Sequence, residues 1–327
     1  MNWKSIAAFV AGLAVLAALA MYAGAGSVAR AFATLGISGL LIIVLVHLPV
    51  EALMGWAWWM IGRDLPGAAR RKFISARFVR DAAAETLPFS QLGGFVLGVR
   101  ALHLGRVGAI GGAVSMSVDL VMELWSKLVY FVVGLLALLA LVPGIRLWNS
   151  LFIAFAVSAI VFAAPFVLRG RLRRWLEASS LAVARRWPSL GAQEDAKSFF
   201  DRLFADRTRL VSGFVIHLVC WFLGAFEAWV VFHLMGLPVT GPEALTIDSL
   251  AMGLRTFAFL VPAAAGIQEG SYVLVCALFA ISPASAIAVS LARRARDLVL
   301  GVPILAIWQL AEAQTAAVKG GDPLREG

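Results

Sequence analysis

Charged residues are scarce in this sequence: 14% of its 327 residues are Asp, Glu, Lys or Arg, whereas 61% are hydrophobic. In an ordinary soluble domain about a quarter of the residues are charged, so this composition excludes that class of protein. The mean hydropathy of +0.88 instead predicts a polytopic helical membrane protein. We therefore expect an all-α fold that forms a single membrane domain over residues 1–327.

Cysteine and histidine are also rare, and no motif of a known enzyme class is present. Cys220 and Cys276 lie far apart in apolar runs, so we expect two buried thiols rather than a disulfide or a thiolate metal site. His217 and His233 have no partner at metal-ligand spacing, and we expect neither a metal nor a cofactor. Since there is no HExxH, nucleophile elbow or Asp-rich diphosphate motif, we expect no enzymatic activity.

The net charge of +9 comes from basic residues that gather in two segments. More than half of the Lys and Arg residues lie in residues 62–80 and 169–209. The positive-inside rule predicts that both are cytoplasmic linkers beside an anionic leaflet, and we expect no nucleic-acid partner. Residues 169–209 alternate charges with aromatic and aliphatic residues, which is typical of an amphipathic surface helix or of a solvated tether.

Long apolar runs predict the membrane spans. They cover residues 4–24, 37–61, 107–142, 147–168, 210–236 and 284–310. With both basic linkers inside, this order places the N-terminus and the C-terminus in the cytoplasm. We expect the membrane to be a bacterial inner membrane. We expect the polar tail, residues 315–327, to be disordered.

Two stretches, residues 81–106 and 243–282, combine helix-forming runs with proline and glycine. The helix-breaking residues are Pro88, Gly93 and Gly94 in the first stretch and Pro262, Gly266 and Gly270 in the second. Broken backbone at membrane depth must be buried in protein or line a wet cavity. We therefore predict two re-entrant hairpins, one open to the cytoplasm and one to the outside, in an inverted repeat like those of secondary transporters.

Some ionisable residues fall inside predicted spans, where a charge facing lipid is costly. Asp119, Glu123 and Lys127 follow one helical stripe. This pattern is compatible with a neutralising Glu123–Lys127 pair or with a cavity lining. His47 and Glu51 also share a helical face, and here we favour local polar packing at a kink over a functional pair.

Three motifs resemble those of a known family. Residues 262–270, P-A-A-A-G-I-Q-E-G, followed by A-x-A-x-S-L-x-x-R at residues 286–294, resemble the membrane domain of lysylphosphatidylglycerol synthases. P-F-S-Q-L-G-G at residues 88–94 is similar to an earlier Pro/Gly-rich motif of that family. The resemblance covers residues 2–316 and includes stand-alone membrane proteins associated with hopanoid biosynthesis. Ala263 and Ala264 stand where the family tends to have glycine.

The resemblance implies lipid handling, with a flippase-like domain that moves a polar or anionic lipid, a phospholipid or a hopanoid-related lipid, between leaflets. It implies no synthase activity here, because we expect no soluble synthase domain. Helix N-termini and arginines would then receive the headgroup, with internal salt bridges as the alternative role of each arginine. The candidate headgroup and transport residues are Glu85, Arg100, Asp119, Glu123, Arg255, Gln268, Glu269, Arg293, Arg294, Arg296 and Asp297.

Two other classes of function stay open at this point. One is a membrane-embedded enzyme that modifies a lipid, and the other is a non-catalytic membrane partner of lipid-biosynthesis enzymes. Membrane lipids are the partners that we expect in every case, and the sequence leaves homo-oligomerisation open.

Overall fold

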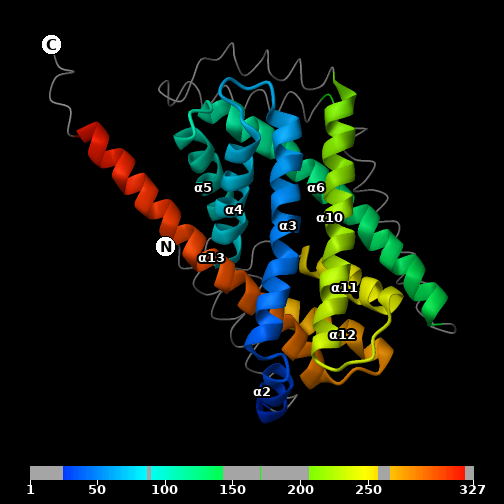
Figure 1. Cartoon of the computed structure of the whole chain (residues 1–327). Helices are drawn as coiled ribbons and strands as arrows, with labels where there is room; N and C mark the ends of the chain where they lie inside the picture. Colours follow the sequence, from blue (N-terminus) through cyan, green and yellow to red (C-terminus); the bar gives the residue numbers. More distant parts are fainter. Residues whose placement is uncertain (1–24, 87–89, 143–169, 171–205, 257–265, 321–327) are drawn as a thin grey trace, which may run out of the picture.

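The computed structural model describes residues 25–86, 90–142, 170, 206–256 and 266–320 (Figure 1). Within these ranges the chain is helical and contains no strand, which confirms the all-α class. The helices are α2 (Ala25–Ala33), α3 (Gly36–Gly62), α4 (Arg70–Thr86), α5 (Ser90–Leu104), α6 (Ala109–Leu141), α10 (Arg207–Leu234), α11 (Gly241–Thr256), α12 (Ile267–Cys276), the 3-10 helix η3 (Ala277–Phe279) and α13 (Pro283–Gly320). The predictions for residues 4–24, 147–168, 171–205 and 321–327, and for Pro88 and Pro262, lie outside the described residues.

Three of the described helices, α3, α6 and α10, are long and apolar enough to cross a membrane. They match the predicted spans 37–61, 107–142 and 210–236 to within a few residues, because an apolar run of this length leaves a membrane helix as its one stable form. The predicted span 284–310 lies within α13, which is not among these three helices. Its centre carries three arginines and Asp297, which lower its hydropathy.

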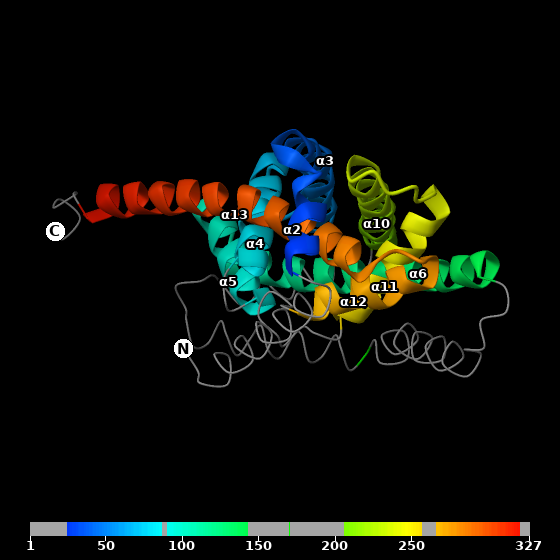
Figure 2. The same ribbon diagram turned by 90° about the horizontal axis from the view of Figure 1, so that it is seen from below.

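The three long helices form the middle of the molecule. In both views α3 and α10 lie side by side, and α6 crosses them on one side (Figures 1 and 2). Phe232, Leu250, Tyr272 and Val289 belong to a buried apolar core contributed by α10, α11, α12 and α13. Large apolar side chains such as Ile37 are exposed on the outer faces, as a lipid-facing helix requires.

Helices α4 and α5 pack against each other in antiparallel fashion through glycines. A Cβ atom at Gly94 would lie 2.6 Å from the Arg80 carbonyl oxygen, and one at Gly98 would lie 2.8 Å from the Arg80 Cβ. Small residues four apart let two helix backbones approach closely. The prediction that Gly93 and Gly94 break the helix is therefore wrong: both lie inside α5, and Gly94 serves helix packing.

Helices α11 and α12 are the counterparts in the second predicted hairpin. Helix α11 ends at Thr256, and α12 begins after Gly266, whose φ of 75° suits a residue without a Cβ. Gly270 was also predicted to break the helix, and this is wrong: its N–H donates to the Gly266 carbonyl at 2.9 Å in the first turn of α12. The re-entrant path of both helix pairs and the inverted repeat stay predictions.

Three segment boundaries differ from those expected. Helix α4 begins at Arg70, so most of the predicted linker 62–80 is helical, and the reason is that Arg77 and Arg80 find buried carboxylate partners. Helix α13 continues through residues 315–320, which were predicted to be disordered. Helix α2 lies between the predicted spans 4–24 and 37–61, where no helix was predicted.

Helix α10 shows how a span begins. The Asp206 carboxylate accepts a hydrogen bond from the Thr208 N–H at 3.1 Å and so caps the helix. A hydrogen bond from the Arg209 side chain, at 2.7 Å, lowers the pKa of Asp206 below its usual value. Asp206 also pairs with Arg63 at the end of α3, which joins the neighbouring ends of the two spans.

Candidate functional site

The first cluster of buried charges lies between α4 and α6. Arg77 is 2% exposed and donates to Asp81, while its Nη1 lies 3.2 Å from the Asp119 Oδ2 and 3.2 Å from the Glu123 Oε2. The Arg80 Nη1 lies 3.1 Å from the same Glu123 oxygen. A buried charge is tolerated when an opposite charge and hydrogen bonds accompany it. The two arginines therefore neutralise the predicted carboxylate stripe of α6.

The alternative in which Glu123 and Lys127 neutralise each other is not the arrangement found. Glu123 turns to the arginines of α4, which can offer it several N–H donors. The Lys127 ammonium instead lies 4.6 Å from the centre of the Trp221 ring, in a cation–π contact.

The second cluster joins α10, α11, α12 and α13. Arg293 donates to Asp248 and to the Tyr272 hydroxyl, and its Nε lies 3.4 Å from the Glu227 Oε1. The Tyr130 hydroxyl of α6 adds a hydrogen bond to Asp248 at 2.7 Å. Side chains from several helices thus converge on one guanidinium.

Arg296 extends this second cluster along α13. It donates to Glu227 of α10, which is 0% exposed, and its Nε lies 3.0 Å from the Asp297 Oδ1. Asp297 pairs with Arg296, its neighbour in the same helix.

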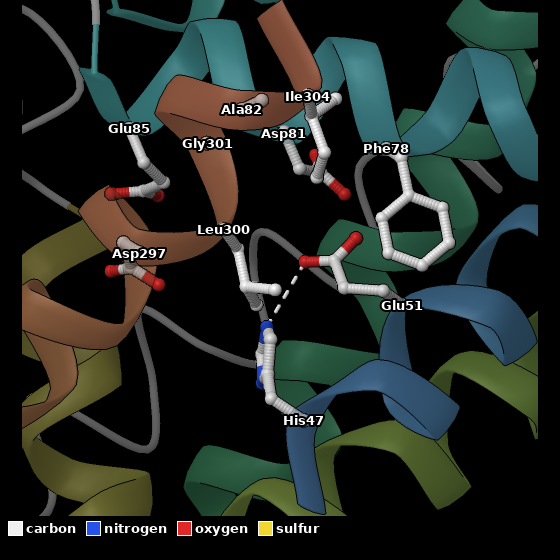
Figure 3. Close-up of a pocket in the computed structure, with 10 residues that line it drawn as sticks. All are labelled: His47, Glu51, Phe78, Asp81, Ala82, Glu85, Asp297, Leu300, Gly301 and Ile304. Atoms are coloured by element: carbon white, nitrogen blue, oxygen red, sulfur yellow. Dashed lines mark hydrogen bonds and ion pairs between the residues drawn. The ribbon is translucent and has the colours of Figure 1, made fainter. Parts of the chain in front are cut away.

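His47 connects the second cluster to a small cavity. Its Nδ1 lies 2.7 Å from the Glu227 Oε2, and its Nε2 lies 3.1 Å from the Glu51 Oε1. His47 and Glu51 line a cavity of about 30 Å³ between α3, α4 and α13, together with Asp81, Glu85 and Asp297 (Figure 3). The interpretation of His47 and Glu51 as local packing is thus too narrow, because His47 also binds a helix 180 residues away.

Glu269 organises a third cluster at the start of α12. Its carboxylate accepts a hydrogen bond from the Gly266 N–H at 2.9 Å and lies 3.0 Å from the Arg294 Nε of α13. Beside it, the Gln268 amide donates to the Ser290 hydroxyl at 3.0 Å. Helix α12 therefore begins at a buried carboxylate that is held by a guanidinium.

One ion pair links the two broken elements. Glu85, in the last turn of α4, accepts from Arg255, in the last turn of α11. Their side chains are 25% and 22% exposed, so this ion pair is more exposed to solvent than those of the three clusters. Both residues lie next to the last residue of their helices, so α4 and α11 meet there through opposite charges.

Of the predicted site residues, Arg100 stands apart from the others. It pairs with Glu312 on the outer part of α13, and its side chain is 55% exposed. The other ten predicted residues lie in the clusters described above or in the Glu85–Arg255 pair.

Sequence reasoning missed several members of these clusters. They are Arg77, Arg80, Asp81, Tyr130, His217, Glu227, Asp248 and Tyr272. Glu227 carried a usable signal, because it is an acid inside an apolar span. Asp248 could have been found in the same way from α11, whereas the tyrosines look like ordinary core residues.

Apolar helices of spanning length that bury ion pairs define an integral membrane protein with a polar interior. The family described as "Lysylphosphatidylglycerol synthase TM region" matches residues 9–304, and the chain belongs to this family. This membership identifies a membrane protein connected with lipid metabolism or transport. The comparisons with curated proteins and with solved structures gave no match.

Proposed function

We propose that this protein moves a phospholipid with an anionic headgroup between the leaflets of a bacterial inner membrane, without changing the lipid chemically. The observation that carries this proposal is the ion-pair network that runs between α4, α6, α10, α11 and α13 inside an apolar helix bundle. Structural stability alone gives little reason for such a network, because well-packed apolar side chains often serve a buried site as well or better.

The network suits an anionic headgroup because arginine binds phosphate and carboxylate in the same way. A planar guanidinium offers paired N–H donors to either group, so a phosphate oxygen can replace a carboxylate oxygen with the same charge and geometry. Among the arginines of the three clusters and the Glu85 pair, Arg255 and Arg294 are the most exposed, with side chains 22% and 20% exposed, and so the most open to such an exchange. Their partners Glu85 and Glu269 would hold the arginines in place when no lipid is bound.

The route that we propose passes between the α4–α5 pair and the α11–α12 pair, where Glu85 meets Arg255. The acyl chains stay in the bilayer beside the exposed apolar faces, and the headgroup crosses along the charged side chains. The cavity of about 30 Å³ between α3, α4 and α13 has room for roughly two water molecules. A headgroup therefore requires the helix pairs to separate, as in transporters that alternate access around a central site.

The experiment that tests this function is a leaflet assay with Glu269→Gln. The purified protein is placed in vesicles of phosphatidylethanolamine and phosphatidylglycerol that contain fluorescent phosphatidylglycerol, and dithionite bleaches the label in the outer leaflet. We expect the wild type to move labelled lipid from the inner to the outer leaflet. The variant should do so about tenfold more slowly, which corresponds to a free-energy barrier that is about 1.4 kcal/mol higher. The reason is that the substitution removes the carboxylate that holds Arg294 at the start of α12.

Glu243→Gln is the matched control for this assay. Glu243 undergoes the same chemical change, but its carboxylate caps the start of α11 through Thr240, away from the clusters. This variant should transport like the wild type. A chemically altered lipid in mass spectrometry would point to an enzyme instead, and label that stays in place with every variant would contradict the proposal.

A further inference from the structure

We propose that the Glu51–His47–Glu227 chain binds an exchangeable proton and that this proton drives lipid movement. The second half of this statement rests on the function proposed above, whereas the first half depends only on the geometry of the three side chains.

The two ring nitrogens of His47 both face carboxylate oxygens. Nδ1 lies 2.7 Å from the Glu227 Oε2 and Nε2 lies 3.1 Å from the Glu51 Oε1. An ionised carboxylate only accepts hydrogen bonds, and a neutral imidazole has a single N–H to donate. A neutral histidine between two ionised carboxylates has one proton, which can make only one of these hydrogen bonds. Both contacts are hydrogen bonds only when the three side chains together hold a second proton. The arrangement is therefore a proton-binding site.

The cavity gives this site access to water. Among the described residues, its lining contains His47 and the carboxylates of Glu51, Asp81, Glu85 and Asp297, and includes no Lys or Arg (Figure 3). The second oxygen of Glu51, Oε2, is buried and accepts no hydrogen bond from an N–H group or a hydroxyl within the described part of the chain. The Asp81 carboxyl lies close enough to Glu51 to share a proton with it. A cavity of about 30 Å³ accommodates roughly two waters, which would satisfy this oxygen and deliver a proton to it.

The charges around His47 are of both signs. The groups that face it or its two carboxylates are Glu51 on α3, Arg77, Asp81 and Glu85 on α4, Glu227 on α10, and Arg293, Arg296 and Asp297 on α13. Asp119 and Glu123 of α6 are occupied by Arg77, Arg80 and His217. Carboxylates and an arginine thus both lie beside the chain that would hold the proton.

The inner end of the chain explains how a proton would move helices. Glu227 holds Arg296 and Arg293 of α13 with the same carboxylate that contacts His47. A proton passed from His47 to Glu227 removes the negative charge that binds these arginines. The hold of α10 on α13 is then weakened. Arg293 keeps Asp248 and Arg296 keeps Asp297, but the N–H groups that faced Glu227 can turn to a headgroup phosphate.

Nitrogen NMR of the wild-type protein tests the proton site without any transport. The chain has four histidines, so nitrogen-labelled histidine gives four pairs of ring signals, and His47→Gln identifies the pair of His47. We expect both ring nitrogens of His47 to carry protons at neutral pH and to lose one as the pH is raised. A His47 that keeps a single N–H over the whole pH range would overturn the inference.

A pH gradient across the vesicle membrane tests the coupling. With the membrane potential held at zero, a gradient of one pH unit is a tenfold ratio of proton activities, so one proton per lipid shifts the leaflet ratio of fluorescent phosphatidylglycerol by about tenfold. We expect this shift with the wild type and with His233→Gln, because His233 is exposed and bonds the Trp229 carbonyl on its own helix. In His47→Gln the shift should disappear.

The outcomes separate the two proposals. If the leaflet ratio does not depend on the pH gradient in either the wild type or His47→Gln, the coupling is contradicted. The proposed lipid movement is not affected by that result. A titrating His47 in a protein that moves no lipid confirms the proton site and contradicts the lipid function.

Discussion

Arg77 shows what keeps a charged side chain inside this protein. It is 2% exposed and contacts Asp81, Asp119 and Glu123, so that its guanidinium meets carboxylates from two helices. Taking charges out of water costs several kcal/mol per ion, and the mutual attraction offsets this cost only when the geometry is good. Removing one partner leaves an uncompensated charge in the apolar bundle.

We predict that Arg77→Gln lowers the free energy of unfolding by about 3–5 kcal/mol, the cost of breaking a buried ion pair from one side. Arg63→Gln is the control, because the Arg63–Asp206 pair is exposed and such pairs contribute about 0–1 kcal/mol. Unfolding of the purified protein in mixed micelles measures both values. Equal losses in the two variants would show that the Arg77 cluster does not stabilise the bundle.

Individual residues also show where sequence reasoning stops. Asp119, Glu123 and Arg293 could be predicted, because an ionisable group in an apolar span needs an explanation. Arg77 and Arg80 could not, since a basic residue beside a span obeys the positive-inside rule equally well whether it meets water or a carboxylate. The partner of a buried charge often lies on another helix, as Glu227 does for His47, and their 180-residue separation hides the contact.

At the scale of elements, apolar run length and backbone chemistry decided what could be predicted. The bounds of α3, α6 and α10 followed from hydropathy, because each apolar run is long enough to cross the hydrocarbon core. Glycine was harder to interpret. Gly266 takes a φ of 75° at a helix start, whereas Gly94 is an ordinary helical residue that lets α4 approach. In the sequence, a glycine that is needed for its backbone conformation looks the same as a glycine that is needed for close helix packing.

We predict that Gly94→Ala pushes α4 and α5 apart and costs about 1–3 kcal/mol of stability, as overpacking does. The added Cβ would meet the Arg80 carbonyl oxygen at 2.6 Å, and backbone cannot swing aside as a flexible side chain can. Gly241→Ala is the control, since a Cβ there has nothing within 4 Å. Thermal unfolding in detergent compares the two. A Gly94→Ala protein as stable as the control would contradict the close packing of the pair.

For the whole molecule, the central feature is the meeting of two helix pairs from distant parts of the chain. The α4–α5 pair and the α11–α12 pair approach through Glu85 and Arg255, 170 residues apart. The sequence predicted a broken element in each half and charged residues beside each break. It could not predict which charges would meet, because that depends on how α6, α10 and α13 arrange the two pairs (Figures 1 and 2).

The most direct test of this account joins Glu85→Cys to Arg255→Cys with a short, reducible, bifunctional thiol reagent during the leaflet assay. Cys220 and Cys276 are buried and should not react. The same reagent across Arg63→Cys and Asp206→Cys, at the exposed ends of α3 and α10, is the control. We predict that the first link stops the slower movement of fluorescent phosphatidylglycerol that the unlinked double variant retains and that reduction returns that rate, while the control link leaves the rate of its own variant unchanged. Lipid movement that continues with the first link in place at the rate of the unlinked variant would contradict the account.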